Sequence, residues 1–408
     1  MSNLVNEKYT MQSCKCDCFI DTTHNQDGSV LTTLRVKALP DKPLLFAYMP
    51  QEGLVRVNPE NGGVESGNLL GELMSIRYGD TDKVVKFFKD NGFLFPISSQ
   101  GLESFSIEDI FSIIFRVRET LNILSMLNKP RIQYKKIMSA ICWLTLSPRI
   151  LIRSIDEQKE EFTTCPHGYM EFLESQRKNN DYDDLQEDLY EADECDFDDT
   201  IYPPEITIST LEISEMLNDP KELLLSGKKT GLSKLDAFLV FQDKPFGKGH
   251  LNENKVIDYF YHLTKEVGDI VSIQNDKAAV SFSCGDKEVA DRLSPQMQSA
   301  TIDVAKITIK EELDYAINAI YPSYDIEAMT GSWVIPDLYS ALVFSVFYIN
   351  HKAELYRECE NPNCGQYFLV STTNSRRKYC SPECSNAMQQ RKYRQKLKKA
   401  STEVDAEN

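Results

Sequence analysis

Apolar side chains recur every three or four residues in several stretches of the chain, which is the spacing of one helix face. The clearest stretch begins at Ser106 and carries Ile107, Ile110, Phe111, Ile114, Val117, Leu121 and Leu124. Asn128 and Pro130 end this helix, and a second helix is expected over 132–146, close enough to pair with it antiparallel. Asp80 as a cap and Gly92 as a stop predict a helix over 81–91. Residues 68–78 are apolar on one face. Further helices are predicted over 205–217, 256–267 and 307–320.

The segment 337–350 has a different pattern, because it is almost wholly apolar and follows Pro336. A helix that is apolar on all sides is buried. We therefore expect it to be a central helix of the large domain and to run nearly straight into the C-terminal segment.

Alternating apolar and polar positions predict short antiparallel strands over 30–37, 44–49 and 54–57, separated by Pro40, Pro43, Pro50 and Gly53. A hairpin is predicted from 270–273 and 278–284. Residues 1–29 are polar and indicate no clear element. The fold class expected is therefore α+β, with a mainly helical large domain over 1–350 and small antiparallel sheets.

Charge is distributed unevenly along the 408 residues, whose net charge is −17. Residues 181–199 hold eleven acidic and no basic side chains, which predicts a solvated surface loop. Residues 351–400 hold eleven Lys/Arg and four Asp/Glu, a net charge of +7. An acidic body disfavours nucleic-acid binding by the whole surface, whereas the basic C-terminal part permits it locally.

Composition places the chain among ordinary globular proteins, with 41% hydrophobic and 26% charged residues. The first residues lack the basic start and apolar core of a signal peptide, and the longest apolar run is too short to span a bilayer. Eleven cysteines is an odd number, and they cluster. We expect a cytoplasmic location, because a reducing compartment keeps thiols free, and no membrane partner.

Four of the cysteines have the spacing of a metal site: Cys359, Cys364, Cys380 and Cys384. Two close pairs fifteen residues apart can surround one tetrahedral Zn²⁺, and four thiolates leave no open position, so the site is structural. Ser381 and Pro382 suit the cap and first turn of a helix that carries the last ligand. A knuckle, a hairpin and a helix in this order are the layout of a treble clef. So short a module cannot bury enough apolar surface to fold alone, so it needs the metal. Four unrelated buried cysteines or two disulfides are the alternatives.

The segment from Leu355 to Asn386 resembles the CGNR-type treble-clef zinc finger. The shared features are Leu-Tyr-Arg-Glu-Cys, which ends at the first ligand, and Cys-Gly-x2-Phe-Leu, which begins at the second. Arg-Arg-Lys-Tyr-Cys-Ser contains the third ligand. The family's Cys-Gly-Asn-Arg is Cys384-Ser385-Asn386-Ala387 here. The resemblance implies a bacterial protein of an uncharacterised family that holds zinc through its finger, and transcription regulation is the role that the resemblance leads us to expect.

Basic side chains near the cysteines predict contacts with DNA or RNA phosphates: Arg376, Arg377, Lys378, Arg391, Arg394 and Lys398. Tyr393, Leu397 and Ala400 form a narrow apolar seam that could dock the last helix on the large domain. The alternatives are a solubilising tail, or an interaction protein whose finger, residues 351–400, is a structural cap. Residues 401–408 are expected to be a disordered tail. The ligand or partner of the large domain is unknown.

Other candidate chemistry is weaker. Cys14, Cys16 and Cys18 could bind a second metal with Cys165 or His167, and this alternative stays open. The stretch 226–230 lacks the residues of a phosphate-binding loop, and the five histidines and the serines match no catalytic motif. The sequence therefore predicts a protein that is not an enzyme.

Overall fold

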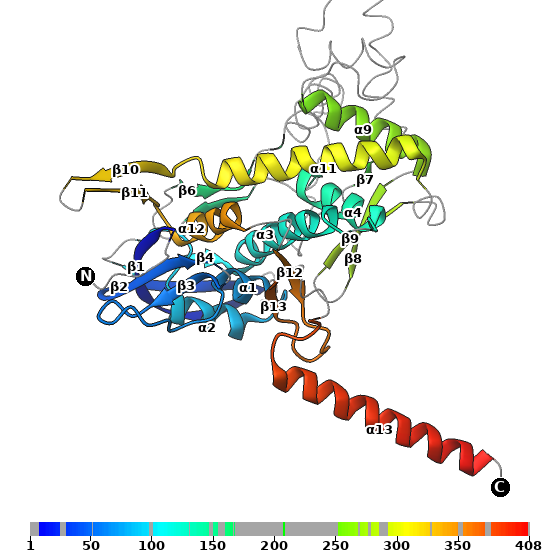
Figure 1. The fold of residues 1–408 in the computed structure, drawn as a ribbon. Helices are drawn as coiled ribbons and strands as arrows, with labels where there is room; N and C mark the ends of the chain where they lie inside the picture. Colours follow the sequence, from blue (N-terminus) through cyan, green and yellow to red (C-terminus); the bar gives the residue numbers. More distant parts are fainter. Residues whose placement is uncertain are drawn as a thin grey trace, which may run out of the picture. The chain divides into compact units, whose positions relative to one another are not determined.

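The computed structural model describes residues 8–24, 30–50, 52–97, 101–129, 131–146, 150–153, 160–165, 167, 207–208, 252–267, 270–275, 279–284, 293–326, 329–349, 354–371 and 377–406. Its contacts divide the chain into two compact units. Unit 1 comprises residues 1–19, 36–102 and 317–408, and unit 2 comprises 20–35 and 103–316. Both units contain helices and small sheets (Figure 1). The α+β class is therefore confirmed in outline, whereas "mainly helical" is not confirmed.

Two long strands begin the chain, β1 (Thr10–His24) and β2 (Val30–Met49), and each contributes residues to both units. They form a sheet in the order β1-β2-β3, with β3 (Gly53–Val57) antiparallel to β2. The separate strands predicted over 30–37 and 44–49 are wrong, because β2 continues through Pro40 and Pro43. Its residues 41–43 are exposed, and a strand tolerates proline where its N–H group is not needed. The strand β1 was not predicted.

Capping residues in the sequence mark the starts of helices in unit 1. Helix α1 (Leu69–Met74) is capped by Asn68, and α2 (Thr81–Asn91) begins after Asp80 and ends at Gly92, as predicted. Asp337 caps α12 (Leu338–Phe344), which is buried on every side, but the regular helix is shorter than predicted. It continues only as the 3-10 turn η1 (Ser345–Tyr348), after which the backbone of Ile349 is extended.

The remaining elements of unit 1 are two hairpins and a long helix. The hairpins are β10 (Tyr321–Asp325) with β11 (Thr330–Val334), and β12 (Glu354–Glu358) with β13 (Tyr367–Ser371), both antiparallel. Helix α13 runs from Pro382 to Ala406. Residues 401–406 are therefore helical, where a disordered tail was predicted. Residues 401–406 contain no glycine or proline that would end the helix.

Unit 2 is built on helices α3 (Ile107–Leu127), α4 (Tyr134–Leu146), α9 (Asn252–Val267) and α11 (Pro295–Ala316). The first three confirm the predicted helices, whereas α11 begins earlier and ends earlier than expected, because Pro295 suits a first helical position. Their apolar faces form one core around the fully buried Tyr259 and Phe260. This burial confirms that the apolar stripes are packing surfaces.

Short strands complete unit 2: β4 (Glu103–Ser106), β5 (Leu151–Arg153), β6 (Glu160–Thr163), β7 (Thr207–Ile208), β8 (Ile270–Asn275) and β9 (Ala279–Cys284). The predicted hairpin is confirmed as β8 with β9. Strand β7 pairs with β8, so the helix predicted over 205–217 is wrong at 207–208, where sheet pairing overrides helical periodicity. Its other residues, the acidic segment 181–199 and the stretch 226–230 lie outside the described residues.

Candidate metal centre

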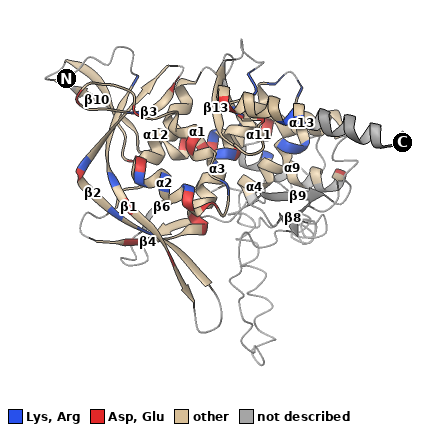
Figure 2. Ribbon diagram, turned by 90° about the horizontal axis from the view of Figure 1, so that it is seen from below, with Lys and Arg blue, Asp and Glu red and all other residues tan. Residues whose placement is uncertain are grey.

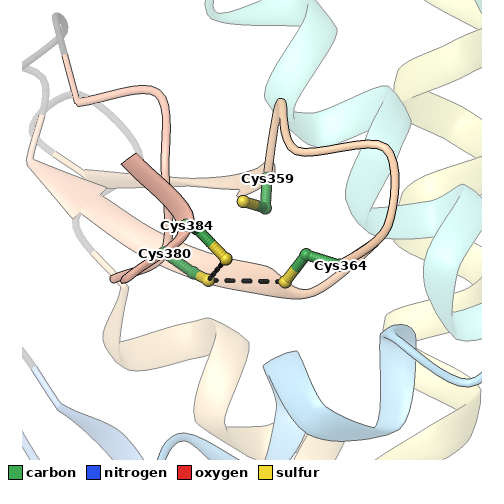
Figure 3. Close-up of side chains that lie close together, drawn as sticks. All are labelled: Cys359, Cys364, Cys380 and Cys384. Carbon is green, nitrogen blue, oxygen red and sulfur yellow. Dashed lines mark hydrogen bonds between the residues drawn. The ribbon is translucent and has the colours of Figure 1, made fainter. Parts of the chain in front are cut away.

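The four cysteines predicted as zinc ligands lie together. Their sulfur atoms are all within 4.8 Å of one another, and Cys380 Sγ lies 3.5 Å from Cys364 Sγ and 3.6 Å from Cys384 Sγ (Figure 3). No disulfide joins them, since all four are free thiols. The four predicted ligands are therefore confirmed as a potential metal site. The alternative of two disulfides is not confirmed.

Local structure explains how the chain gathers these thiols. Cys359 and Cys364 bound the turn between β12 and β13, where the Cys359 amide donates to Gln366 O at 2.9 Å and Gly365 adopts a φ of +63°. Glycine takes this left-handed conformation without a steric cost. Ser381 Oγ accepts a hydrogen bond from Cys384 N at 3.4 Å, which confirms the predicted helix start. The treble-clef classification stays a prediction.

The thiols share a small core with two side chains of β13, Phe368 and Val370. Arg377 holds this core together, because its guanidinium lies 5.0 Å above the Phe368 ring and donates to the carbonyls of Tyr379 and Cys380. Lys378 pairs with Glu360 at 3.2 Å. Two of the residues predicted to contact nucleic acid therefore also stabilise the finger, although their bonds are exposed.

The arrangement fits zinc. A tetrahedral site with Zn–S bonds of about 2.3 Å separates its sulfurs by about 3.8 Å, close to the distances observed between neighbouring thiols. The Asn361 amide donates to Cys384 Sγ and lowers the pKa of that thiol to about 7, whereas burial raises the pKa of Cys364. When bound, zinc would hold all four sulfurs as thiolates and supply folding stability to the module.

The finger is bonded to helix α1 of the same unit. Tyr356 donates its hydroxyl hydrogen to Asn68 Oδ1 at 2.9 Å, and the amide of Tyr367 donates to Ser75 Oγ at 2.8 Å. A Cβ atom on Gly71 would lie 2.5 Å from the Tyr367 carbonyl oxygen, so helix and strand touch backbone to backbone. The β12–β13 hairpin is therefore part of the packing of unit 1.

Two of the predicted nucleic-acid residues on α13, Arg391 and Arg394, lie in solvent. Arg391, Lys392 and Arg394 are exposed, and none of the ion pairs found within the described part of the chain involves them. Figure 2 colours the Lys and Arg positions of the ribbon blue, including those on the described part of α13. Tyr393 is 65% exposed, so the proposed apolar seam is not docked at this residue. Arg376 and the side chains of Leu397, Lys398 and Ala400 lie outside the described residues.

Two cysteines of β1, Cys16 and Cys18, are buried packing residues. Cys16 donates its thiol hydrogen to Phe88 O at 3.2 Å, and Cys18 donates to Val85 O at 3.4 Å, both on α2. Among the described residues, Cys14, Cys16 and Cys18 belong to no group with ligand geometry. Cys165 and His167 instead gather with Glu312, which the sequence reasoning missed because this residue follows them by about 145 positions.

Comparisons with known proteins agree with the geometry of the finger. The model of the CGNR zinc finger family matches residues 356–396. Neither the curated proteins nor the solved structures contain a match. No helix among the described residues combines the length and apolar character needed to cross a membrane. Residues 356–396 are thus a CGNR zinc finger, and their four cysteines form its potential metal site.

Proposed function

We propose that this chain binds DNA or RNA through the basic first half of α13, with zinc in the finger fixing the direction of that helix. In this proposal the protein is a cytoplasmic bacterial regulator of transcription, and it is not an enzyme. The large domain senses a ligand or holds a partner. The observation that carries the proposal is the exposure of Arg391, Lys392 and Arg394 on a helix whose first turn contains the metal ligand Cys384.

Charge supports this assignment locally. The chain carries a net charge of −17, so phosphate attraction has to come from a segment of opposite sign. Because no ion pair neutralises Arg391 or Arg394 among the described residues, both guanidinium groups are available to phosphate oxygens. Arg377 and Lys378 already bond within the finger, so we assign them a smaller part of the affinity.

The dependence of affinity on salt tests the proposal. Each neutralised phosphate releases counterions, with a slope near −0.9 per contact in a plot of log affinity against log salt. Replacing Arg391 and Arg394 with alanine should flatten the slope by about two units and leave the zinc content unchanged. The matched control replaces Lys83 and Lys86, two exposed side chains of α2, and so removes the same charge elsewhere.

The outcomes distinguish specific contacts from general attraction. If both double variants flatten the slope equally, α13 is not the binding surface. If the intact chain shows no affinity for DNA or RNA at low salt, the nucleic-acid proposal fails.

A second function is favoured by the bonds between the finger and α1. The hydrogen bonds from Tyr356 to Asn68 and from Tyr367 to Ser75 join the finger to the rest of unit 1, as expected for a structural cap in an interaction protein. In that case loss of zinc lowers the stability of unit 1, and the intact chain does not bind nucleic acid. Both readings require zinc, so nucleic-acid binding is the result that separates them.

A further inference from the structure

A second group of metal-type ligands lies inside unit 2. Cys165 and His167 follow strand β6, and Glu312 comes from α11. All three are buried, and their ligand atoms lie within 4.8 Å of one another. Sulfur, imidazole nitrogen and carboxylate oxygen are the three ligand types that Zn²⁺ accepts in proteins.

The surrounding hydrogen bonds orient these atoms. His167 Nδ1 lies 2.7 Å from Glu311 Oε2, and its Nε2 lies 2.7 Å from Glu312 Oε1. A histidine that binds a metal usually donates its other ring N–H to a carboxylate, which fixes the ring and its tautomer. Glu311 is in the position of that carboxylate, so Nε2, which faces Glu312 Oε1, is the nitrogen left for a metal.

Arg116 completes the environment from α3. It is buried and pairs with Glu312 Oε1, and it also donates to the Cys165 carbonyl oxygen at 3.4 Å. Carboxylates that bind metals are themselves hydrogen-bonded. The ligand side chains are thus held by neighbours on α3 and α11.

Charge balance permits a metal ion at this point. The Arg116 guanidinium carries one positive charge, and the carboxylates of Glu311 and Glu312 with a metal-bound Cys165 thiolate would carry three negative charges. A divalent cation would bring this total to zero. A buried group of charges is tolerated only when such balance holds.

We propose that Cys165, His167 and Glu312 bind a second metal ion, with Zn²⁺ as the best match to this ligand set. Three protein ligands leave one position of a tetrahedral ion open, unlike the four-cysteine site, which is closed. The site lies within unit 2 and is independent of the finger and of nucleic-acid binding.

Metal stoichiometry of the full chain tests the proposal. After reconstitution with Zn²⁺ and removal of loosely held metal, the wild type should retain about two ions, one in a closed and one in an open site. Cys165→Ser and Glu312→Gln should each retain about one, because a hydroxyl or amide is a poorer ligand than thiolate or carboxylate. The control Cys142→Ser changes another buried cysteine of unit 2, which is outside the cluster, and should retain about two.

A second measurement applies if Cys165→Ser does not fold. Co²⁺ is added to the full chain with all four finger cysteines changed to serine. A thiolate-to-cobalt absorption band should appear, and it should vanish when Glu312→Gln is added.

The proposal is overturned if the folded wild type retains about one zinc ion after reconstitution, or if both ligand variants keep the wild-type content. The absence of a cobalt band in the finger-less chain overturns it as well. The cluster is then a buried network of ion pairs and hydrogen bonds. Loss of the second ion in Cys165→Ser and Glu312→Gln, but not in the control, supports it.

Discussion

Tyr356 in the first strand of the finger donates its hydroxyl hydrogen to Asn68 Oδ1 at 2.9 Å. The same oxygen accepts a hydrogen bond from the amide of Gly71 at the start of α1, and the Asn68 side-chain amide donates to Glu52 O. One side chain therefore caps a helix and joins the finger to it. Any loss of order in the finger consequently affects the start of α1.

We predict that Tyr356→Phe lowers the free energy of unfolding by about 1 kcal/mol, because it removes this hydrogen bond and keeps the ring. Chemical denaturation followed by circular dichroism measures the change. Zinc content should not change, since Tyr356 is not a ligand. Tyr393→Phe is the matched control, because Tyr393 is exposed on α13 and should show no effect. Equal stability of Tyr356→Phe and wild type would argue against a tightly bonded finger.

We predict that Gly71→Ala destabilises the chain by about 1–3 kcal/mol, as overpacking does elsewhere. The new Cβ would lie 2.5 Å from the Tyr367 carbonyl oxygen, a backbone atom of β13 that cannot rotate away. Thermal unfolding measures the loss. Gly331→Ala is the control, since a Cβ there meets nothing within 4 Å. A wild-type melting temperature for Gly71→Ala would show that α1 and β13 are not held this closely.

We predict that Cys380→Ser removes about one zinc ion per chain and unfolds the finger, because thiolate–metal bonds supply most of the stability of so small a module. Elemental analysis gives the metal content. Helices α3, α4, α9 and α11 have their own core in unit 2, so most of the helical signal should remain. A metal-free wild-type protein with an ordered finger would contradict this prediction.

We predict that Asp109→Asn stabilises the chain near pH 7 and has little effect near pH 4. Burial, with a smaller effect of Glu108, raises the pKa of Asp109 from 3.8 to about 6. The folded state therefore binds the proton more tightly than the unfolded state, and this stabilisation is lost as pH rises from about 4 through about 6. Asparagine cannot ionise, so it avoids a cost on the order of 1 kcal/mol per unit of pKa shift.

Unfolding at a series of pH values checks this prediction. The exposed Glu60→Gln variant is the control for removal of one negative charge, and it should follow the wild-type pH profile. If Asp109→Asn also follows the wild-type profile, the carboxyl is not buried enough to resist ionisation.

Short-range chemistry made much of the candidate site predictable. Two cysteine pairs at close spacing indicate one zinc ion, since each pair needs only a turn to bring its thiols together. Asp80 and Ser106 cap helices α2 and α3, where the sequence predicts the helix starts, because a cap acts through atoms three residues away. In each case the interacting groups are neighbours in the chain, so the sequence by itself determined the result.

Long-range packing decided what the sequence could not. Strand β2 passes through Pro40 and Pro43. Thr207 joins a sheet instead of a helix, because its partner Val271 comes from a distant segment. Glu312 meets His167 about 145 residues away, and Tyr356 meets Asn68 across 288. Such contacts depend on how whole elements bury their apolar surface, and periodicity along one element carries no information about which partner it packs against.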